Sequence, residues 1–218
     1  MKTIYLTIIA CMFALHMSGQ VKPIELSHYV FPEFLEGEIL MKNGVKKAAL
    51  LNYNSLSEEM VFIERGVKLA IADDELKRID TMFIEGRRFV VLNDDIVEVL
   101  LDKNSAKVFA LHKCRVKRPG SRTAYGGTSH STTSTSYGQI TTGARIYELE
   151  LPDGYEADPF IVYWIIKNGE HTRLSNLRQL RRFYRDNHDL WNQFTGQNDV
   201  NFNNSREVRQ LIEYLEGY

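Results

Sequence analysis

Cysteine and long apolar runs are scarce in this chain. Only two of its 218 residues are cysteine, Cys11 and Cys114. If Cys11 is removed with an amino-terminal signal, no intramolecular disulfide can form and the hydrophobic core must stabilise the fold. A core is feasible at this length, because a chain of about 150 residues already buries some 70% of its unfolded surface.

The chain also lacks an excess of charge of either sign. It has 27 Lys and Arg residues against 28 Asp and Glu residues. This balance gives no argument for a nucleic-acid partner. The sequence has no Gly-x-Ser-x-Gly elbow and no phosphate-binding Walker motif. We therefore predict no catalytic residue and no cofactor from motifs.

The one long apolar run lies at the amino terminus, from Ile4 to Met17, after the positively charged Lys2. It is short for a membrane span, which needs about 20 residues, and small residues follow it. We predict that residues 1–19 are a signal peptide cleaved after Gly19, and that the mature chain has no transmembrane span. The expected destination is the periplasm or cell envelope.

A second interpretation of this segment involves Cys11. The residues Ile8-Ile9-Ala10-Cys11 resemble the motif in which a bacterial lipoprotein is lipidated on its cysteine. Only ten residues precede this cysteine, and the apolar run continues past it. The cleaved signal is therefore the preferred interpretation, and a lipoprotein anchored through Cys11 is the alternative.

Residues 20–170 have the pattern of a β-rich domain. Short runs of β-branched and aromatic residues alternate with turn residues at even spacing, which is typical of antiparallel hairpins. The clearest hairpin signal is Asn43-Gly44, because this pair tolerates the positive φ of a tight turn. Asp73 to Leu76 fits either a helical turn or a loop.

Residues 120–143 differ in composition from the strands around them. Of these 24 residues, 17 are Ser, Thr or Gly. Such a segment buries too little apolar surface to offset the entropy of ordering it. We predict a long flexible loop that joins two strands of one sheet. Tyr125 and Tyr137 are its candidate binding residues, since tyrosine offers a large contact area at low entropic cost.

Residues 171–218 switch to helical periodicity. Ser175 is the predicted cap of a first helix that carries Leu177 and Leu180, and a short second helix carries Trp191. Asn204, with a glutamate three residues later, forms a candidate capping box before an apolar stripe. The fold prediction is α+β: mainly an antiparallel β meander, either an open sheet or a partial barrel, with a small C-terminal helical tail packed on it.

Several segments give the chain a resemblance to a known group of proteins. They include Phe34 to Ile39, Leu51 to Asn54, Arg87-Arg88-Phe89 and the helical tail from Leu174 to Tyr218. In these segments the chain resembles a group of exported proteins of Gram-negative bacteria that has no known activity. The resemblance implies export and a β-sheet with a helical tail, and it implies no catalytic residue.

His112 and Cys114 are the weak candidates for a metal or catalytic site. They lie two residues apart on a predicted strand, so their side chains share one face. Such a pair could begin a zinc or copper site, or Cys114 could act as a nucleophile with a distant histidine. The alternative is an ordinary strand face with a small buried cysteine.

These patterns favour an exported, non-catalytic envelope protein that acts by binding an unknown envelope protein or glycan. One alternative is an envelope hydrolase or metal-dependent enzyme with its site near His112 and Cys114. A pocket that holds His112 with Cys114 or a carboxylate, in surroundings that shift a pKa, would favour that enzyme. The other alternative is a structural component that self-associates through exposed sheet edges.

Overall fold

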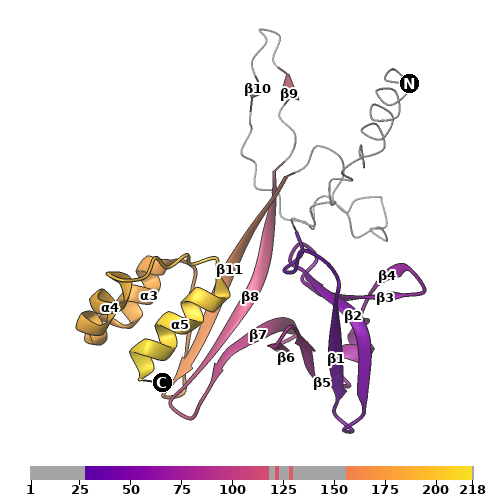
Figure 1. The fold of residues 1–218 in the computed structure, drawn as a ribbon, viewed down its shortest axis with the longest axis horizontal. Helices are drawn as coiled ribbons and strands as arrows, with labels where there is room; N and C mark the ends of the chain where they lie inside the picture. The colour runs from indigo at the N-terminus through magenta and orange to yellow at the C-terminus, as the bar shows by residue number, and fades with distance from the viewer. Residues whose placement is uncertain (1–27, 118–120, 123–127, 130–155, 218) are drawn as a thin grey trace, which may run out of the picture.

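The computed structural model describes residues 28–117, 121–122, 128–129 and 156–217. In this part of the chain, ten strands form one antiparallel sheet in the order β12-β11-β8-β7-β6-β5-β1-β2-β3-β4 (Figure 1). The strands are β1 (Leu35–Met41), β2 (Lys46–Asn54), β3 (Glu59–Glu64), β4 (Val67–Ala70), β5 (Ile79–Ile84), β6 (Arg87–Leu92), β7 (Asp95–Asp102), β8 (Ala106–Lys117), β11 (Glu156–Lys167) and β12 (Glu170–Leu174). The sheet is open, because β12 and β4 each have only one neighbour.

Three helices and a 3-10 turn follow the last strand along the chain, and the α+β prediction is confirmed. They are α3 (Leu177–Phe183), the 3-10 turn η3 (Arg185–Asn187), α4 (His188–Thr195) and α5 (Ser205–Glu216). The stretch from Asp73 to Leu76, which the sequence left open, is the single-turn helix α2. None of the described helices is long and apolar enough to cross a bilayer.

Tight turns set the register of the hairpins. At Asn43-Gly44, which joins β1 to β2, Gly44 has a φ of +84° and the Asn43 side chain accepts a hydrogen bond from the Val45 amide at 3.1 Å. The Met41 amide donates to the Val45 carbonyl at 2.8 Å and the Gly44 amide donates to the Met41 carbonyl at 2.9 Å, so the loop has three residues, 42–44. A tight turn followed by one residue with positive φ is a common form of such a loop. The predicted hairpin therefore forms where the sequence placed it.

The sheet departs once from a simple meander. After β4 the chain passes through α2, and β5 then pairs with β1 on the side away from β2. Gly37 in β1 allows β5 to approach closely, since a Cβ atom there would lie 2.6 Å from the Phe83 carbonyl oxygen. This crossover makes β1 a central strand.

Strands β8 and β11, which flank the stretch predicted as a flexible loop, pair with each other. Their register runs from Glu156 opposite Lys117 to Lys167 opposite Ala106. Between them, β9 (Ser121–Arg122) and β10 (Thr128–Ser129) form a separate two-stranded ladder. The other residues of 118–155, including Tyr125 and Tyr137, lie outside the described residues, as does the predicted signal 1–19.

The first helix begins one residue later than predicted. Asn176, and not Ser175, is its N-cap, and the Asn176 side chain accepts a hydrogen bond from the Gln179 amide at 2.9 Å. Asn176 is favoured because Gln179 then stands at the third helical position, from which its side chain reaches back to the Ser175 amide at 2.7 Å. The Asn204 cap is confirmed: its side chain accepts from the Arg206 and Glu207 amides at the start of α5.

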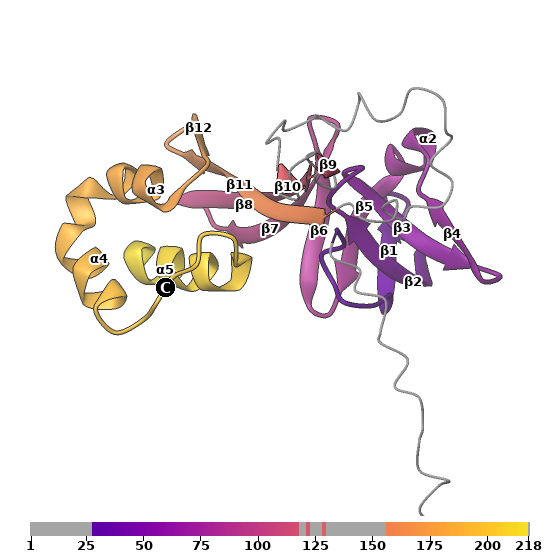
Figure 2. The ribbon, with the colours of Figure 1, turned by 90° about the horizontal axis from the view of Figure 1, so that it is seen from above.

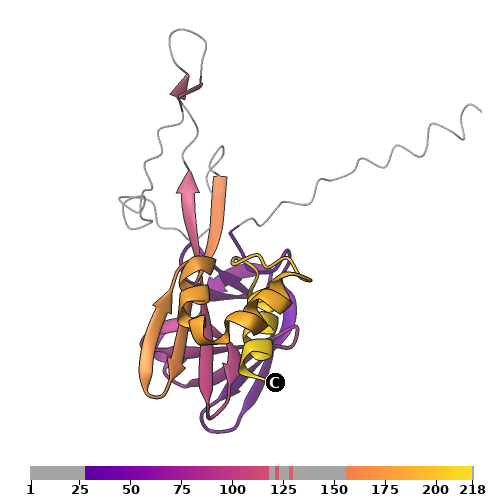
Figure 3. The same cartoon turned by 90° about the vertical axis from the view of Figure 1, so that its left-hand side faces the viewer.

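Two hydrophobic cores lie on one face of the sheet. The helix core is formed where α3, α4 and α5 cover β7, β8, β11 and β12, and it includes Leu180, Trp191 and Leu211 (Figures 2 and 3). The sheet core is formed by residues of β1, β2, β3, β5, β6 and β7 together with Phe31 and Ile71, and Tyr53 and Phe89 are fully buried in it. A smaller apolar cluster occupies the opposite face of β7, β8 and β11.

Candidate functional site

A charged residue separates the two cores on β7. Glu98 stands opposite Phe89 of β6 on one side and opposite Ala110 of β8 on the other. Phe89 belongs to the sheet core and Ala110 to the helix core. Glu98 is only 4% exposed, so its carboxylate requires partners within the protein.

Arg87 is the main partner of this carboxylate. Its Nε donates to Oε1 of Glu98 at 2.7 Å, and its Nη2 donates to Oε2 at 2.6 Å. The two bonds form the bidentate arrangement that gives an arginine–carboxylate pair both strength and direction. The guanidinium also lies over the ring of Phe31, with 4.8 Å between the Arg87 Cζ and the ring centroid.

His112 completes the buried network, which we call the seam cluster (Arg87, Glu98, His112 and Ser205). The His112 Nε2 lies 2.8 Å from Glu98 Oε2 and 3.1 Å from Arg87 Nη2. A carboxylate only accepts, so the 2.8 Å contact is a hydrogen bond when Nε2 carries a proton and donates it to Glu98. A protonated Nε2 cannot accept from Arg87, whose Nη2 then lies beside it and donates to Glu98.

The pKa values follow from this arrangement. Burial alone would raise the pKa of Glu98, but the hydrogen bonds from His112 and Arg87 outweigh it and lower the pKa to about 2. Burial lowers the pKa of His112, since Arg87 already balances the charge of Glu98 and a second buried cation would be costly. At neutral pH the cluster thus holds one cation and one anion.

Ser205 connects the seam cluster to the helical tail. Arg87 Nη2 donates to the Ser205 Oγ at 3.4 Å, a long bond at the first residue of α5. One residue later, Arg206 pairs with Glu85 at 2.8 Å. Both contacts fix the start of α5 against the turn between β5 and β6.

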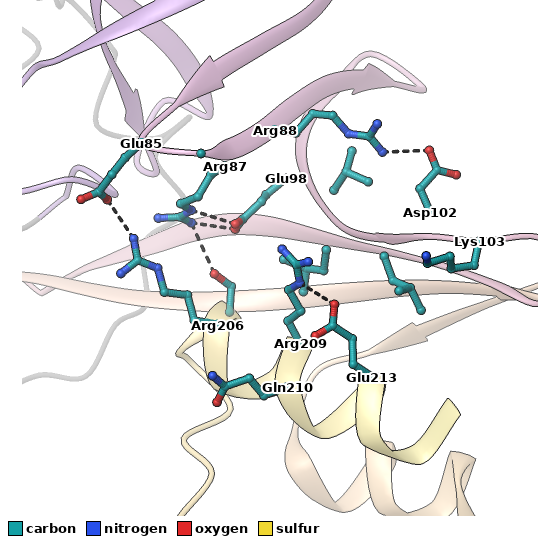
Figure 4. A pocket seen from close by; sticks show the side chains of 15 residues that line it. Glu85, Arg87, Arg88, Glu98, Asp102, Lys103, Arg206, Arg209, Gln210 and Glu213 are labelled. Carbon is teal, nitrogen blue, oxygen red and sulfur yellow. Dashed lines mark hydrogen bonds and ion pairs between the residues drawn. The ribbon is translucent and has the colours of Figure 1, made fainter. Parts of the chain in front are cut away.

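Two grooves open on either side of Arg87. The first groove has a volume of about 790 Å³ and lies between α5 and strands β6 and β7 (Figure 4). Its charged side chains are largely paired, with Arg88 on Asp102 and Arg209 on Glu213, each at 2.8 Å. This groove therefore presents a polar, nearly neutral surface.

The second groove has a volume of about 630 Å³ and shares Glu85, Arg87, Ser205 and Arg206 with the first. Its remaining walls come from residues 29–32, Ser55, β8, the first half of β11 and the loop before α5. His112 lines this groove, whereas Glu98 lines the first. Arg87 thus lies at the boundary between them.

The two metal candidates do not form a joint site. Cys114 is half-buried, its Sγ lies 3.3 Å from the Arg115 carbonyl oxygen, and burial raises its thiol pKa. A raised pKa disfavours the thiolate that a metal or a nucleophilic reaction needs. Within the described ranges, no three His, Cys, Asp or Glu side chains are close enough to hold a metal ion.

The arrangement that would favour an enzyme, His112 in a pocket with a carboxylate and shifted pKa values, is present in part. His112 lines a groove beside a carboxylate, and both pKa values are shifted. However, the nearby hydroxyl of Ser205 contacts Arg87 and not His112. A triad needs the base to contact its nucleophile, and this serine does not meet that requirement.

The sequence reasoning missed Arg87, Glu98 and Ser205. A usable signal was a glutamate inside the apolar run Ile96 to Leu101, since an acid in such a strand needs an internal partner. Comparison with known families, curated proteins and solved structures returned no match.

Proposed function

We propose that this protein is an exported, non-catalytic envelope protein that binds its partner in the two grooves beside Arg87. The observation that carries the proposal is the position of the buried seam cluster at the boundary of both grooves. Concave surfaces with a few fixed polar groups are the usual form of a binding site. Export is supported by the apolar amino-terminal segment with its small residues.

The rigidity of the site favours binding. Arg87 is fixed by Glu98 on one side and by the Phe31 and Phe89 rings on the other, with ring distances of 4.8 and 5.5 Å. Side chains that are already ordered lose little entropy when a ligand arrives. The grooves are therefore suited to recognising one ligand geometry.

A hydrolase is the second candidate, favoured by the 2.8 Å contact between His112 and Glu98 beside a groove. A water molecule would have to serve as its nucleophile, with His112 as the base. Replacing His112 with glutamine would then abolish hydrolysis of envelope extracts. Unchanged processing of those extracts would remove this candidate.

Site-specific photocrosslinking tests the binding proposal. A photoreactive phenylalanine analogue replaces Gln210 in the first groove or Pro32 in the second, in the full chain expressed in a Gram-negative host. Exposed Gln197, which lines neither groove, is the control position. We expect discrete crosslinked products from a groove position and none from Gln197.

The same experiment separates the grooves from the Ser/Thr/Gly-rich segment. Placing the photoreactive group at Tyr125 tests the binding residue suggested by the sequence. Products formed only from Tyr125 would contradict the groove proposal and favour that segment. Equal products from every position, including Gln197, would also contradict it, because they would indicate unspecific contact.

A further inference from the structure

Two asparagines of the second groove are held by their carbonyl oxygens. Asn203 Oδ1 accepts from the Ile161 amide at 3.2 Å, and Asn201 Oδ1 accepts from the Asn203 amide at 2.9 Å. These bonds to backbone donors fix which end of each side-chain amide is oxygen. No described residue accepts a hydrogen bond from either Nδ2 group, and both side chains are exposed. Each asparagine therefore keeps a free pair of donors at the groove.

Arg87 and Ser205 add donors to the same groove. Arg87 uses Nε and Nη2 within the seam cluster, and no described residue accepts from its Nη1. Ser205 Oγ accepts from Arg87, and no acceptor for its own hydrogen is present among the described residues. We call Arg87, Asn201, Asn203 and Ser205 the donor wall.

The cations around the donor wall already have carboxylate partners. Arg87 pairs with Glu98 and Lys113 with Glu58, each at 2.6 Å, and Arg206 pairs with Glu85 at 2.8 Å. What the wall offers is hydrogen-bond donors that have no acceptor among the described residues, and these favour a ligand rich in acceptors. A carboxylate fits this requirement, because both of its oxygens only accept.

Part of the groove is apolar. Val30, Phe31, Pro32, Pro159 and Phe160 line it together with the donor wall. A fitting ligand therefore carries a carboxylate close to an apolar group. The end of a peptide chain has this form, because the terminal carboxylate and the last side chain leave the same Cα atom.

We propose that the second groove binds the C-terminal carboxylate of a peptide whose last side chain is apolar. The carboxylate contacts the donor wall, and the last side chain packs against the apolar residues. Capture of a terminal carboxylate by fixed donors is a known mode of peptide recognition. The proposal rests on the binding function given above and specifies its ligand.

Fluorescence polarisation with the full mature chain tests this inference. The probe is a labelled pool of short peptides that end in leucine, prepared with either a free C-terminal carboxylate or a C-terminal amide. We expect the amide pool to bind at least about tenfold more weakly, because charge-assisted hydrogen bonds to the carboxylate are lost.

Asn203→Asp is the decisive variant. An aspartate at this position can still accept from the Ile161 amide, but it replaces the free donor with a negative oxygen. We expect about tenfold weaker binding of the free-acid pool. Asn192→Asp makes the same charge change on α4, away from both grooves, and should leave binding unchanged. If Asn203→Asp fails to fold, Asn201→Asp repeats the test, since it keeps the bond from the Asn203 amide.

Other outcomes overturn the inference in distinguishable ways. Equal binding of acid and amide pools, or binding unaffected by either groove variant, would exclude a carboxylate at the donor wall. Binding of an oligogalacturonate instead, lost in Asn203→Asp, would make the ligand an acidic glycan and leave the groove function standing. Failure of every probe, together with no crosslink from Gln210 or Pro32, would remove both proposals.

Discussion

Replacing Arg87 with methionine should strongly destabilise the fold, because it leaves the Glu98 carboxylate buried without its cation. The side chains of the two residues are only 14% and 5% exposed. Removing one member of a buried pair costs about 3–5 kcal/mol. The pKa of Glu98 gives a similar scale, since lowering it from 4.5 to about 2 corresponds to about 3 kcal/mol at neutral pH.

The destabilisation should depend on pH with a definite sign. In the wild-type protein the folded pKa of Glu98 lies below its unfolded value, so its contribution is complete above pH 4.5 and is lost as the pH falls toward 2. Without Arg87, burial raises the pKa of Glu98 and the carboxylate takes up a proton more readily. The difference between Arg87→Met and wild type should therefore shrink as the pH is lowered from 7 to about 4.

Urea unfolding followed by circular dichroism measures both effects. The matched control is Arg88→Met, which removes the adjacent arginine and its exposed pair with Asp102. That pair is 38% and 44% exposed, so its loss should cost no more than about 1 kcal/mol. Adding Glu98→Gln to Arg87→Met should recover part of the loss, because no charge then remains buried. Equal losses for the two arginine variants, or a deficit that does not vary with pH, would refute the reasoning.

Three further changes test separate features of the fold by urea unfolding. His112→Gln keeps a donor to Glu98 but cannot titrate. Wild type should lose stability as the pH falls below 6.5, because the unfolded His112 takes up a proton more readily than the buried one, and the variant should not show this loss. An unchanged dependence of the unfolding free energy on pH would contradict this. Asn176→Ala should cost about 1 kcal/mol and Ser175→Ala almost nothing, and the reverse order would restore Ser175 as the cap. Gly37→Ala should cost about 1–3 kcal/mol, because its Cβ would meet the Phe83 carbonyl at 2.6 Å, and a neutral result would mean that β5 can shift.

The hairpins could be predicted from the sequence because their signals are local. Asn43-Gly44 carries its turn preference within two residues, and the strands on either side have the required alternation. The wrong prediction of Ser175 as N-cap also has a local cause. Ser175 and Asn176 are adjacent and both are favourable N-cap residues, and the hydrogen bonds of Gln179 favour Asn176. The return of β5 to β1 has no such signal, since it depends on contacts made after α2.

Only part of the seam cluster could be predicted from the sequence. Once the β6–β7 hairpin is set, Glu98 stands opposite Phe89, so Arg87 lies diagonally across on the same face. That pair could have been found from the register. The contact with Ser205 could not, because residue 205 reaches Arg87 only after the helical tail has packed on the sheet.

Strand β7 belongs to both cores at once. Ile96 packs into the sheet core, while Leu100 packs into the helix core. Loss of order in this strand would remove packing from both cores, so neither can open fully without the other. We therefore expect the two halves of the sheet to unfold as one cooperative unit, so that a ligand bound at either groove stabilises the whole sheet.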